Sequence, residues 1–427
     1  MPPSSLFEPL VFASGNQVVN RIAKAAMEEG LGDAQHAPSD ELIRLYGRWA
    51  AGGAGLLISG NVMIDRRAMT GPGGLVLEDD STLPRFAQWA QVGRSQGAQF
   101  WMQINHPGRQ VFADMGQPAW APSQVPLQMG AMSRMFAPPR EMTEQHIQEV
   151  IERFVRAATL AQRAGFNGVE IHAAHGYLLS QFLSPLSNRR QDRWGGSLAN
   201  RARLLLEVVR QVREAVSRDF GVAVKLNSAD FQRGGFDVDD AKQVVGWLND
   251  LNVDFVELSG GSYEAPAMQG QTRDERTLAR EAYFLDFAAQ VAVVARMPLM
   301  VTGGIRRLAV AEQVRASGVA LVGLATALAL RPDLPRAWSE GLDPAPELPP
   351  IGWQNKALRA LATMALVRRN LHRLGRGHAA SAHLSPAWTV LVDRWQARRK
   401  TSQYRRRMAA LQAGTGAQAV SPGASVQ

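Results

Sequence analysis

Three side chains that can hydrogen-bond a carbonyl oxygen or transfer a proton fall within six residues of one another. His172, His175 and Tyr177 follow directly on a short apolar run at 169–171. Two imidazole donors on a carbonyl oxygen would stabilise the negative charge that develops there, and a phenol beside them would protonate the neighbouring carbon. A strand that ends in such a cluster is typical of an active-site rim, and structural hydrogen bonding at the strand end is the weaker alternative.

A metal site is a less favoured interpretation of the two histidines. Their His-x-x-His spacing differs from the His-Glu-x-x-His zinc motif, and no Asp or Glu lies in the same turn. The chain also contains no cysteine. This excludes disulfides, thiolate metal sites, cysteine-ligated iron–sulfur clusters and a cysteine nucleophile.

The elements that must position these residues alternate between short apolar runs and amphipathic segments. Strands are predicted at 20–26, 55–63, 98–104, 167–172, 221–227, 253–259, 298–302 and 319–324. Helical periodicity is clear at 142–164, where Thr143 is the expected N-cap, at 199–217 and at 238–250. Eight such alternations favour a parallel sheet closed into a (β/α)8 TIM barrel. The alternative, a doubly wound open sheet, lacks its Gly-x-Gly-x-x-Gly fingerprint after the first strand.

Two further polar residues lie at predicted strand ends. The amide of Gln103 suits the edge of a heterocycle such as a flavin, or else it caps a loop. Lys225 could offset the charge that a flavin acquires near N1 on reduction, or form a salt bridge with Asp230 or Asp254. Glycine turns also follow three late strands, at 260–261, 303–304 and 323–325. After the seventh and eighth strands of a barrel, such turns cradle phosphates with backbone N–H groups.

The positive charge of the chain is concentrated near its C-terminus. The whole chain carries +9, yet 356–407 holds thirteen Lys and Arg against Asp393 alone, a net +12, which leaves the remainder at −3. We predict a barrel at 1–340, a basic helical C-terminal extension at 341–412 with helices near 353–374 and 386–412, and a disordered tail at 413–427. The basic helices are expected to pack on the barrel or on a partner subunit. Binding to nucleic acid or to an anionic membrane is the less favoured alternative.

The remaining features restrict the class of protein. The segment 106–141 is rich in Pro, Gly and Met and follows the third strand, so we expect a binding loop or lid over the barrel mouth. No run approaches the roughly 18 apolar residues that cross a bilayer, and the N-terminus lacks the features of a secretory signal. A cytoplasmic location is the resulting expectation.

Motifs spread from about residue 10 to residue 335 form a characteristic series. They are Asn-Arg-Ile-Ala-Lys-Ala-Ala-Met at 20–27, the segments 55–60 and 103–109, the cluster at 172–177, the segment 188–197 followed by Asn200 and Arg201, and the segments 256–261 and 302–306. In this combination and order they resemble the Old Yellow Enzyme family of NAD(P)H:flavin oxidoreductases, in its single-domain branch. The branches with an iron–sulfur cluster are excluded because this chain has no cysteine.

The resemblance implies a (β/α)8 barrel that uses FMN, takes hydride from NAD(P)H and reduces the activated C=C bond of an α,β-unsaturated carbonyl compound. His172 and His175 would hold the carbonyl oxygen, and Tyr177 would protonate the α-carbon. The positions around the flavin ring would be Ala25, Met27, Glu28, Gly60, Gln103 and Lys225. Those near the flavin phosphate would be Gly303, Gly304, Leu324 and Ala325.

Three positions depart from the family pattern. Glu28 replaces the usual Thr or Cys near flavin O4, so we expect this carboxyl to be protonated or turned away. Thr326 replaces the usual phosphate-binding arginine, so another cation, such as Arg306 or one from the basic extension, is expected to take that role. Lys225 replaces the commoner Arg and keeps the charge without the bidentate fork.

Other functions stay open at this point. They are oxidative demethylation or dehydrogenation of a small molecule, a barrel tied to nucleic acid or membrane by its basic extension, and a degenerate barrel without cofactor. Tyr177 favours alkene reduction, because the delivery of a hydride and a proton needs an acid. A homo-oligomer is compatible with all of these functions.

Overall fold

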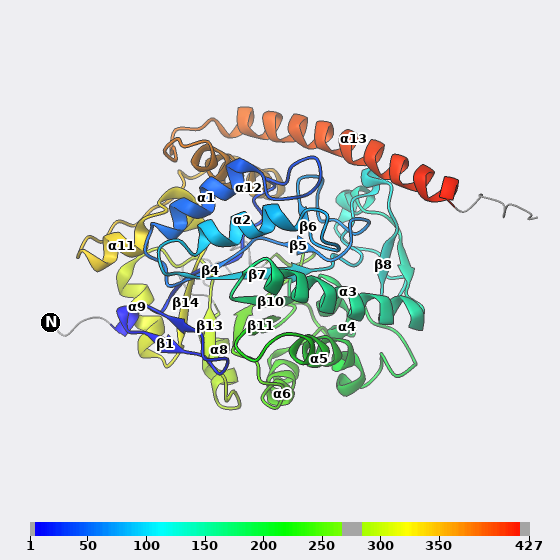
Figure 1. Cartoon of the computed structure of the whole chain (residues 1–427), viewed down its shortest axis with the longest axis horizontal. Coiled ribbons are helices and arrows are strands. Elements are labelled where there is room, and N and C mark those ends of the chain that lie inside the picture. The colour runs from blue at the N-terminus through cyan, green and yellow to red at the C-terminus, as the bar shows by residue number, and fades with distance from the viewer. Residues whose placement is uncertain (1–4, 267–283, 419–427) are drawn as a thin grey trace, which may run out of the picture.

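The computed structural model describes residues 5–266 and 284–418 of the chain. Eight parallel strands close into a barrel, because the last strand pairs again with the first (Figure 1). In order around the barrel they are β3 (Ile22–Lys24), β4 (Leu56–Ile58), β7 (Gln99–Asn105), β10 (Gly168–Ala173), β11 (Gly221–Asn227), β12 (Phe255–Ser259), β13 (Leu299–Val301) and β14 (Leu321–Leu324). Each overlaps a predicted strand. The predicted barrel is confirmed and the open sheet is wrong.

Helices surround the barrel (Figure 1). They are α1 (Asp40–Ala50), α2 (Leu83–Gly93), α3 (Glu144–Arg163), α4 (Leu178–Leu183), α5 (Leu198–Ala215), α6 (Val238–Leu248), α8 (Leu285–Ala292), α9 (Leu308–Ala316), α10 (Thr326–Leu330) and α11 (Leu334–Ser339). In α3 the predicted N-cap is confirmed, since the side chain of Thr143 accepts the N–H of His146. Among the described residues, no helix is both long and apolar enough to span a bilayer.

The amino end of the barrel is filled by three aromatic rings. Trp101, on β7, lies 5.5 Å from Phe12 and 5.1 Å from Phe255 between ring centroids. Phe12 belongs to the bend between two short strands, β1 (Leu10–Val11) and β2 (Gln17–Val18), that pair with each other. These rings form a dry floor, so a ligand can enter only from the carboxyl ends of the strands.

Glycine is required where Trp101 meets the neighbouring strands. A Cβ on Gly221 would lie 2.2 Å from the Trp101 ring, and one on Gly168 would lie 2.6 Å from it. Each glycine is the first residue of its strand, β11 or β10. The indole therefore occupies the space that two side chains would otherwise take.

We predict that Gly221→Ala destabilises the protein by about 1–3 kcal/mol, because the new methyl group overlaps a buried ring that has no room to move. The midpoint of urea unfolding measures this loss. Gly246→Ala is the matched control: Gly246 lies inside α6 with no heavy atom within 4 Å of a new Cβ. That control should be neutral or stabilising by up to about 1 kcal/mol. Equal midpoints for both variants would contradict the tight floor.

The predicted loop at 106–141 contains short elements. They are the 3-10 turns η2 (Ala113–Met115) and η3 (Gly130–Met135) and the strands β8 (Ala119–Ala121) and β9 (Pro139–Glu141), which pair with each other. Phe112 stacks on Phe136 with 5.0 Å between ring centroids. Two further strands, β5 (Val62–Met63) and β6 (Leu75–Val76), extend the sheet beside β7. The segment 106–141 is therefore folded, with short elements that its composition did not indicate.

Two helices form the C-terminal extension, α12 (Lys356–Gly375) and α13 (Pro386–Gln418), as predicted (Figure 1). They dock on loops at the carboxyl ends of the strands. His372 Nε2 lies 2.9 Å from the carbonyl oxygen of Glu29, and Lys400 donates to the carbonyl of Gly30 at 2.6 Å. Helix α13 continues to Gln418, so it enters the segment predicted to be disordered, and 419–427 lies outside the described residues.

Candidate active site

Side chains near the carboxyl ends of neighbouring strands face one interior. His172 of β10 is paired in register with Lys225 of β11, which is paired in turn with Glu257 of β12. On the other side, Glu170 of β10 is paired with Gln103 of β7. All five side chains are buried. Because residues two apart on a strand share a face, His172 and Glu170 point into the same space.

The three rings that the sequence singled out come together. The ring centroid of His172 lies 4.9 Å from that of His175 and 4.9 Å from that of Tyr177, with nearly perpendicular planes. The N–H of Ala174 donates to Nδ1 of His172 at 3.2 Å, so we assign the proton of this neutral ring to Nε2. Nε2 of His175 lies 2.8 Å from Oγ of Ser259, so this imidazole is held by the end of β12.

A left-handed turn makes this convergence possible. His175 has φ 60° and Gly176 has φ 71°, so the chain reverses directly after β10. The turn is held by Asn227, whose Oδ1 accepts the N–H of His175 at 3.0 Å, and by Gln110, whose Nε2 donates to the carbonyl of His175 at 2.9 Å. A non-glycine left-handed residue is uncommon, and here one hydrogen bond from β11 and one from the loop after β7 hold it in place.

Burial sets the protonation states of the cluster. Desolvation lowers the pKa of both His172 and His175 well below the usual range. The charges of His175 and Lys225 lower the pKa of His172 further, and the charge of Lys225 also lowers that of His175. Both imidazoles are therefore neutral at neutral pH. Burial raises the pKa of Tyr177 well above its usual range, so the phenol keeps its proton. In the described ranges, no group of three or more His, Asp or Glu is arranged to hold a metal ion.

Sequence reasoning missed the partner of the phenol. Tyr263 Oη lies 3.1 Å from Tyr177 Oη, and burial also raises the pKa of Tyr263. Tyr263 follows the glycine turn after β12 by two residues, and this position was the available signal. The two hydroxyls form a chain along which the proton of Tyr177 can be replaced.

Glu28 is held in place by hydrogen bonding and not exposed as a free charge. Its Oε1 accepts the hydroxyl of Thr70 at 2.8 Å. Burial raises the pKa of Glu28, while the Thr70 hydrogen bond and the charge of Arg368 act against this rise. The negative charge of Glu28 contributes to raising the pKa of both Tyr177 and Tyr263. Arg368 belongs to α12, so the C-terminal extension supplies a cation at the mouth.

Lys225 has a different partner from those predicted. Its Nζ donates to Oε1 of Glu257 at 2.7 Å. Of the two predicted partners, Asp254 instead accepts the N–H groups of Ser14 and Val222, and Asp230 accepts that of Phe236. The prediction missed Glu257 because the register that places it beside Lys225 is set by the pairing of β11 with β12, which the sequence does not specify.

A second carboxyl lies beside this ion pair. Gln103 Nε2 donates to Oε1 of Glu170 at 2.6 Å. Burial, together with the charge of Glu257, raises the pKa of Glu170 well above its usual range, although Lys225 opposes the shift. Within the described part of the chain, Oε2 of Glu170 and Oε2 of Glu257 are buried without a hydrogen-bond partner. A polar group bound among these side chains would satisfy them.

The loops after β3 and β4 touch each other, and they carry Ala25, Met27 and Gly60, which were predicted to lie around the flavin ring. Ala25 donates its N–H to the carbonyl of Leu324, which joins the end of β3 to the end of β14. A Cβ on Gly60 would lie 2.1 Å from the carbonyl oxygen of Met27, so only glycine allows these loops to touch. Ala25 and Leu324 are buried and Met27 packs against the main core.

The predicted phosphate turns follow β13 and β14. Gly303 has φ 122° and Gly304 has φ 71°, so this turn uses conformations that other residues avoid. Ala325 directly precedes α10, whose first residue is Thr326. Arg306, one predicted substitute for the missing arginine, forms an ion pair with Glu347.

Comparison with known proteins identifies the scaffold. The chain matches the NADH:flavin oxidoreductase / NADH oxidase family over residues 5–344. It is 37% identical over 350 residues to the NADH-dependent flavin oxidoreductase iliE of Hypocrea jecorina, covering 77% of this chain and 87% of the relative. It is 38% identical over 324 residues to the NADH-dependent flavin oxidoreductase nadA of Aspergillus parasiticus, covering 71% and 72%. The old yellow enzyme homologue from Zymomonas mobilis superposes with a TM-score of 0.69 at 25% identity, covering 83% of this chain and 98% of that one.

The chain belongs to the NADH:flavin oxidoreductase family. It is an oxidoreductase that uses FMN, with NAD(P)H as reductant. The residues at the mouth fit this cofactor. A buried amide and a buried cation suit the polar edge of a flavin, the unpartnered carboxyl oxygens need a polar neighbour, and the glycine turn after β13 suits a phosphate.

We predict that Glu28→Thr raises the reduction potential of the bound flavin, because an ionised carboxylate at the mouth opposes the charge gained on reduction. The increase should be largest at high pH, where Glu28 is ionised, and should shrink at low pH, where the wild-type carboxyl is protonated. Potentiometric titration against pH measures the effect. The isosteric Glu28→Gln also removes the charge, so it should raise the potential by a similar amount. Identical potentials at every pH would place Glu28 out of reach of the ring.

Proposed function

We propose that this protein reduces the activated C=C bond of α,β-unsaturated carbonyl compounds with hydride from NAD(P)H. The observation that carries the proposal is the protonated phenol of Tyr177, packed against the neutral imidazole of His172 at the mouth of a flavin barrel. Alkene reduction needs one hydride and one proton, and Tyr177 supplies the acid. The Zymomonas mobilis neighbour is named an old yellow enzyme homologue, and the resemblance of this chain to that family implies the same class of reaction.

Each side chain of the cluster has a separate task. Nε2–H of His172 donates to the substrate carbonyl oxygen and stabilises the charge that develops there. His175 completes the donor pair, with its orientation fixed by Ser259. Tyr177 transfers its proton to the α-carbon, and Tyr263 lies within hydrogen-bond distance to restore it. FMN, when bound, supplies the hydride to the β-carbon.

The cofactor contacts follow from the same geometry. Lys225 would face the pyrimidine edge and stabilise negative charge there, and its pKa is raised because Glu257 and Glu170 outweigh desolvation. The residues proposed around the flavin ring are Ala25, Met27, Glu28, Gly60, Gln103 and Lys225. Those proposed near the phosphate are Gly303, Gly304, Leu324 and Ala325.

We expect Tyr177→Phe to slow the reoxidation of the reduced flavin by an enone about 10²–10⁴-fold, the usual contribution of a positioned general acid. Reduction of the flavin by NADH should change little, because hydride transfer to the flavin needs no proton at this position. Anaerobic stopped-flow absorbance separates the two half-reactions. Tyr263→Phe is the matched variant and should have a smaller effect, because it removes only the secondary donor. If Tyr177→Phe slowed both half-reactions equally, the role of Tyr177 as the acid would be wrong.

We also predict that Thr326→Arg tightens FMN binding, because it supplies a guanidinium at the start of α10 near the proposed phosphate site. The dissociation constant of FMN, measured by fluorescence quenching on reconstituted protein, tests this. Thr326→Gln is the neutral control. An unchanged constant in the arginine variant would mean that the phosphate lies elsewhere.

A further inference from the structure

Helix α13 is anchored to the protein by one face only. Thr389, Thr401, Tyr404 and Met408 are buried, and they recur at helical spacing along one side. The hydroxyl of Tyr404 donates to the carbonyl of Arg66 at 2.8 Å, and Met408 lies in an apolar cluster with residues of the loops that cover the mouth. The long helix therefore has a fixed orientation and presents its other side to solvent.

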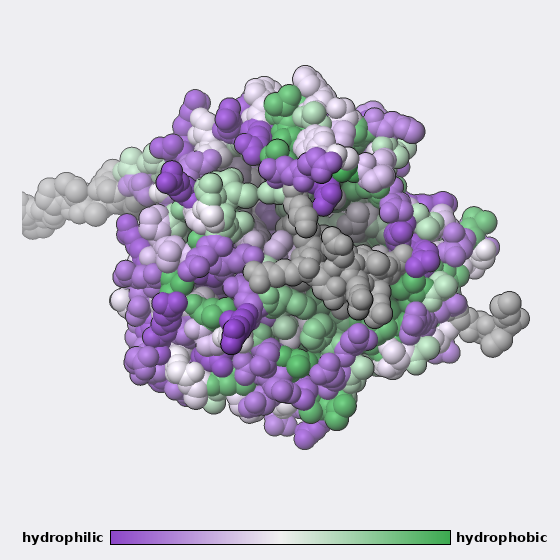
Figure 2. Space-filling model, turned by 180° about the vertical axis from the view of Figure 1, so that it is seen from behind, coloured by the Kyte–Doolittle hydropathy of each residue, from purple (hydrophilic) through white to green (hydrophobic). Residues whose placement is uncertain are grey.

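The solvent-facing side carries three large apolar residues. Trp388, Leu391 and Trp395 are 65%, 62% and 56% exposed. Their spacing of three and four residues places them in one row on the helix. Figure 2 shows the molecule from behind, with hydrophilic and hydrophobic residues mixed over the top, the region where α12 and α13 lie in Figure 1. Large exposed apolar residues in such a row mark a contact site and not an ordinary soluble surface.

Arginines surround this row. Arg394, Arg398, Arg399, Arg405 and Arg406 of α13 are exposed, and the guanidinium of Arg399 lies 4.7 Å from the ring centre of Trp395.

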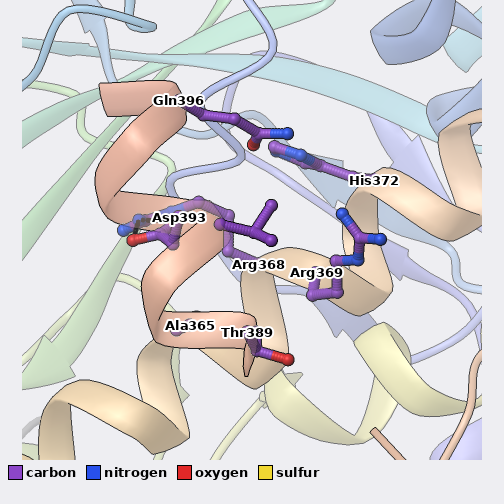
Figure 3. A pocket seen from close by; sticks show the side chains of 8 residues that line it. Ala365, Arg368, Arg369, His372, Thr389, Asp393 and Gln396 are labelled. Carbon is purple, nitrogen blue, oxygen red and sulfur yellow. Dashed lines mark hydrogen bonds and ion pairs between the residues drawn. The ribbon is translucent and has the colours of Figure 1, made fainter. Parts of the chain in front are cut away.

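The acidic residue of the helix does not offset these charges. The sequence of α13 contains one acidic residue, Asp393, and both of its carboxyl oxygens already bind Arg368 of α12, at 2.7 and 2.8 Å (Figure 3). The exposed face is thus cationic as well as apolar.

We propose that this face of α13 binds the surface of an anionic lipid bilayer. Tryptophan and leucine enter the boundary between headgroups and acyl chains, while arginines beside them contact phosphates. A second copy of the chain fits less well, because two such faces would bring like-charged arginines together. A nucleic-acid duplex would use the arginines but would leave the apolar row of Trp388, Leu391 and Trp395 without a partner.

Helix α13 also contacts loops that surround the barrel mouth. Lys400 contacts the loop after β3, and Tyr404 contacts the loop after β5. Both loops lie at the carboxyl ends of the strands, the end that holds the candidate site. Binding through α13 would therefore place the mouth beside the bilayer, where apolar substrates concentrate.

The test is flotation of the full-length, FMN-loaded protein with vesicles. We expect it to float with vesicles of phosphatidylcholine and phosphatidylserine, to stay in solution with phosphatidylcholine alone, and to be partly released by high salt. Tryptophan emission should shift to the blue on binding. No flotation with anionic vesicles at low salt would overturn the proposal.

Two variants of α13 separate the contribution of the arginines from that of the apolar row. Arg394→Gln with Arg398→Gln should lower partition into anionic vesicles roughly 25-fold, at about fivefold for each arginine. Trp388→Ser with Leu391→Ser and Trp395→Ser should abolish the blue shift and lower partition at least as much. The matched control is Val11→Ser with Val293→Ser, two exposed apolar residues on other elements, and it should float like wild type.

Flavin content and thermal unfolding verify that each variant is folded. If the control lost flotation equally, binding would be non-specific and the proposal would be wrong. A duplex DNA shift that competes with flotation and depends on the same arginines would instead assign the face to nucleic acid. A dimer in light scattering that the Trp388/Leu391/Trp395 variant dissociates would assign it to a second copy. Either result would overturn the lipid proposal.

Discussion

The structure depends on the removal of water from a group of polar side chains at the mouth of a closed barrel. Burial makes the imidazoles of His172 and His175 neutral and keeps the phenol of Tyr177 protonated. The same burial would be unfavourable for Lys225, yet Glu257 lies 2.7 Å away and compensates its charge. The closed floor of Trp101, Phe12 and Phe255 keeps this environment dry from below.

The regular part of the fold could be predicted from the sequence because it follows simple periodicities. Apolar runs of five to nine residues between helical segments predicted all eight barrel strands, and the N-cap at Thr143 followed from its position before an amphipathic stretch. The His172, His175 and Tyr177 cluster was also predicted, since a single turn brings these rings together. The short strands of 106–141 were not, because their pairing is set by tertiary contacts such as the Phe112–Phe136 stack.

Long-range partners were the part that sequence reasoning could not supply. Glu257 and Tyr263 lie on or after β12, far along the chain from the residues they contact. The glycine turn after β12 places Tyr263 near a strand end, but no spacing in the sequence pairs it with Tyr177. The left-handed conformation of His175 likewise depends on Asn227, 52 residues away. The C-terminal extension shows the same limit. Its helices were predicted from the sequence. The proximity of Arg368 to Glu28 and the exposure of Trp388 and Trp395 depend on how these helices dock on the barrel.

One measurement tests the central claim most directly, namely that a flavin at this mouth passes hydride to an activated alkene. The purified protein, loaded with FMN under anaerobic conditions, is bleached with NADH or NADPH and then mixed with a simple enone such as 2-cyclohexenone. The account predicts that the yellow flavin absorbance returns and that the saturated ketone is formed in equal amount. A reduced flavin that stays colourless with a range of enones, yet is reoxidised by oxygen, would contradict it.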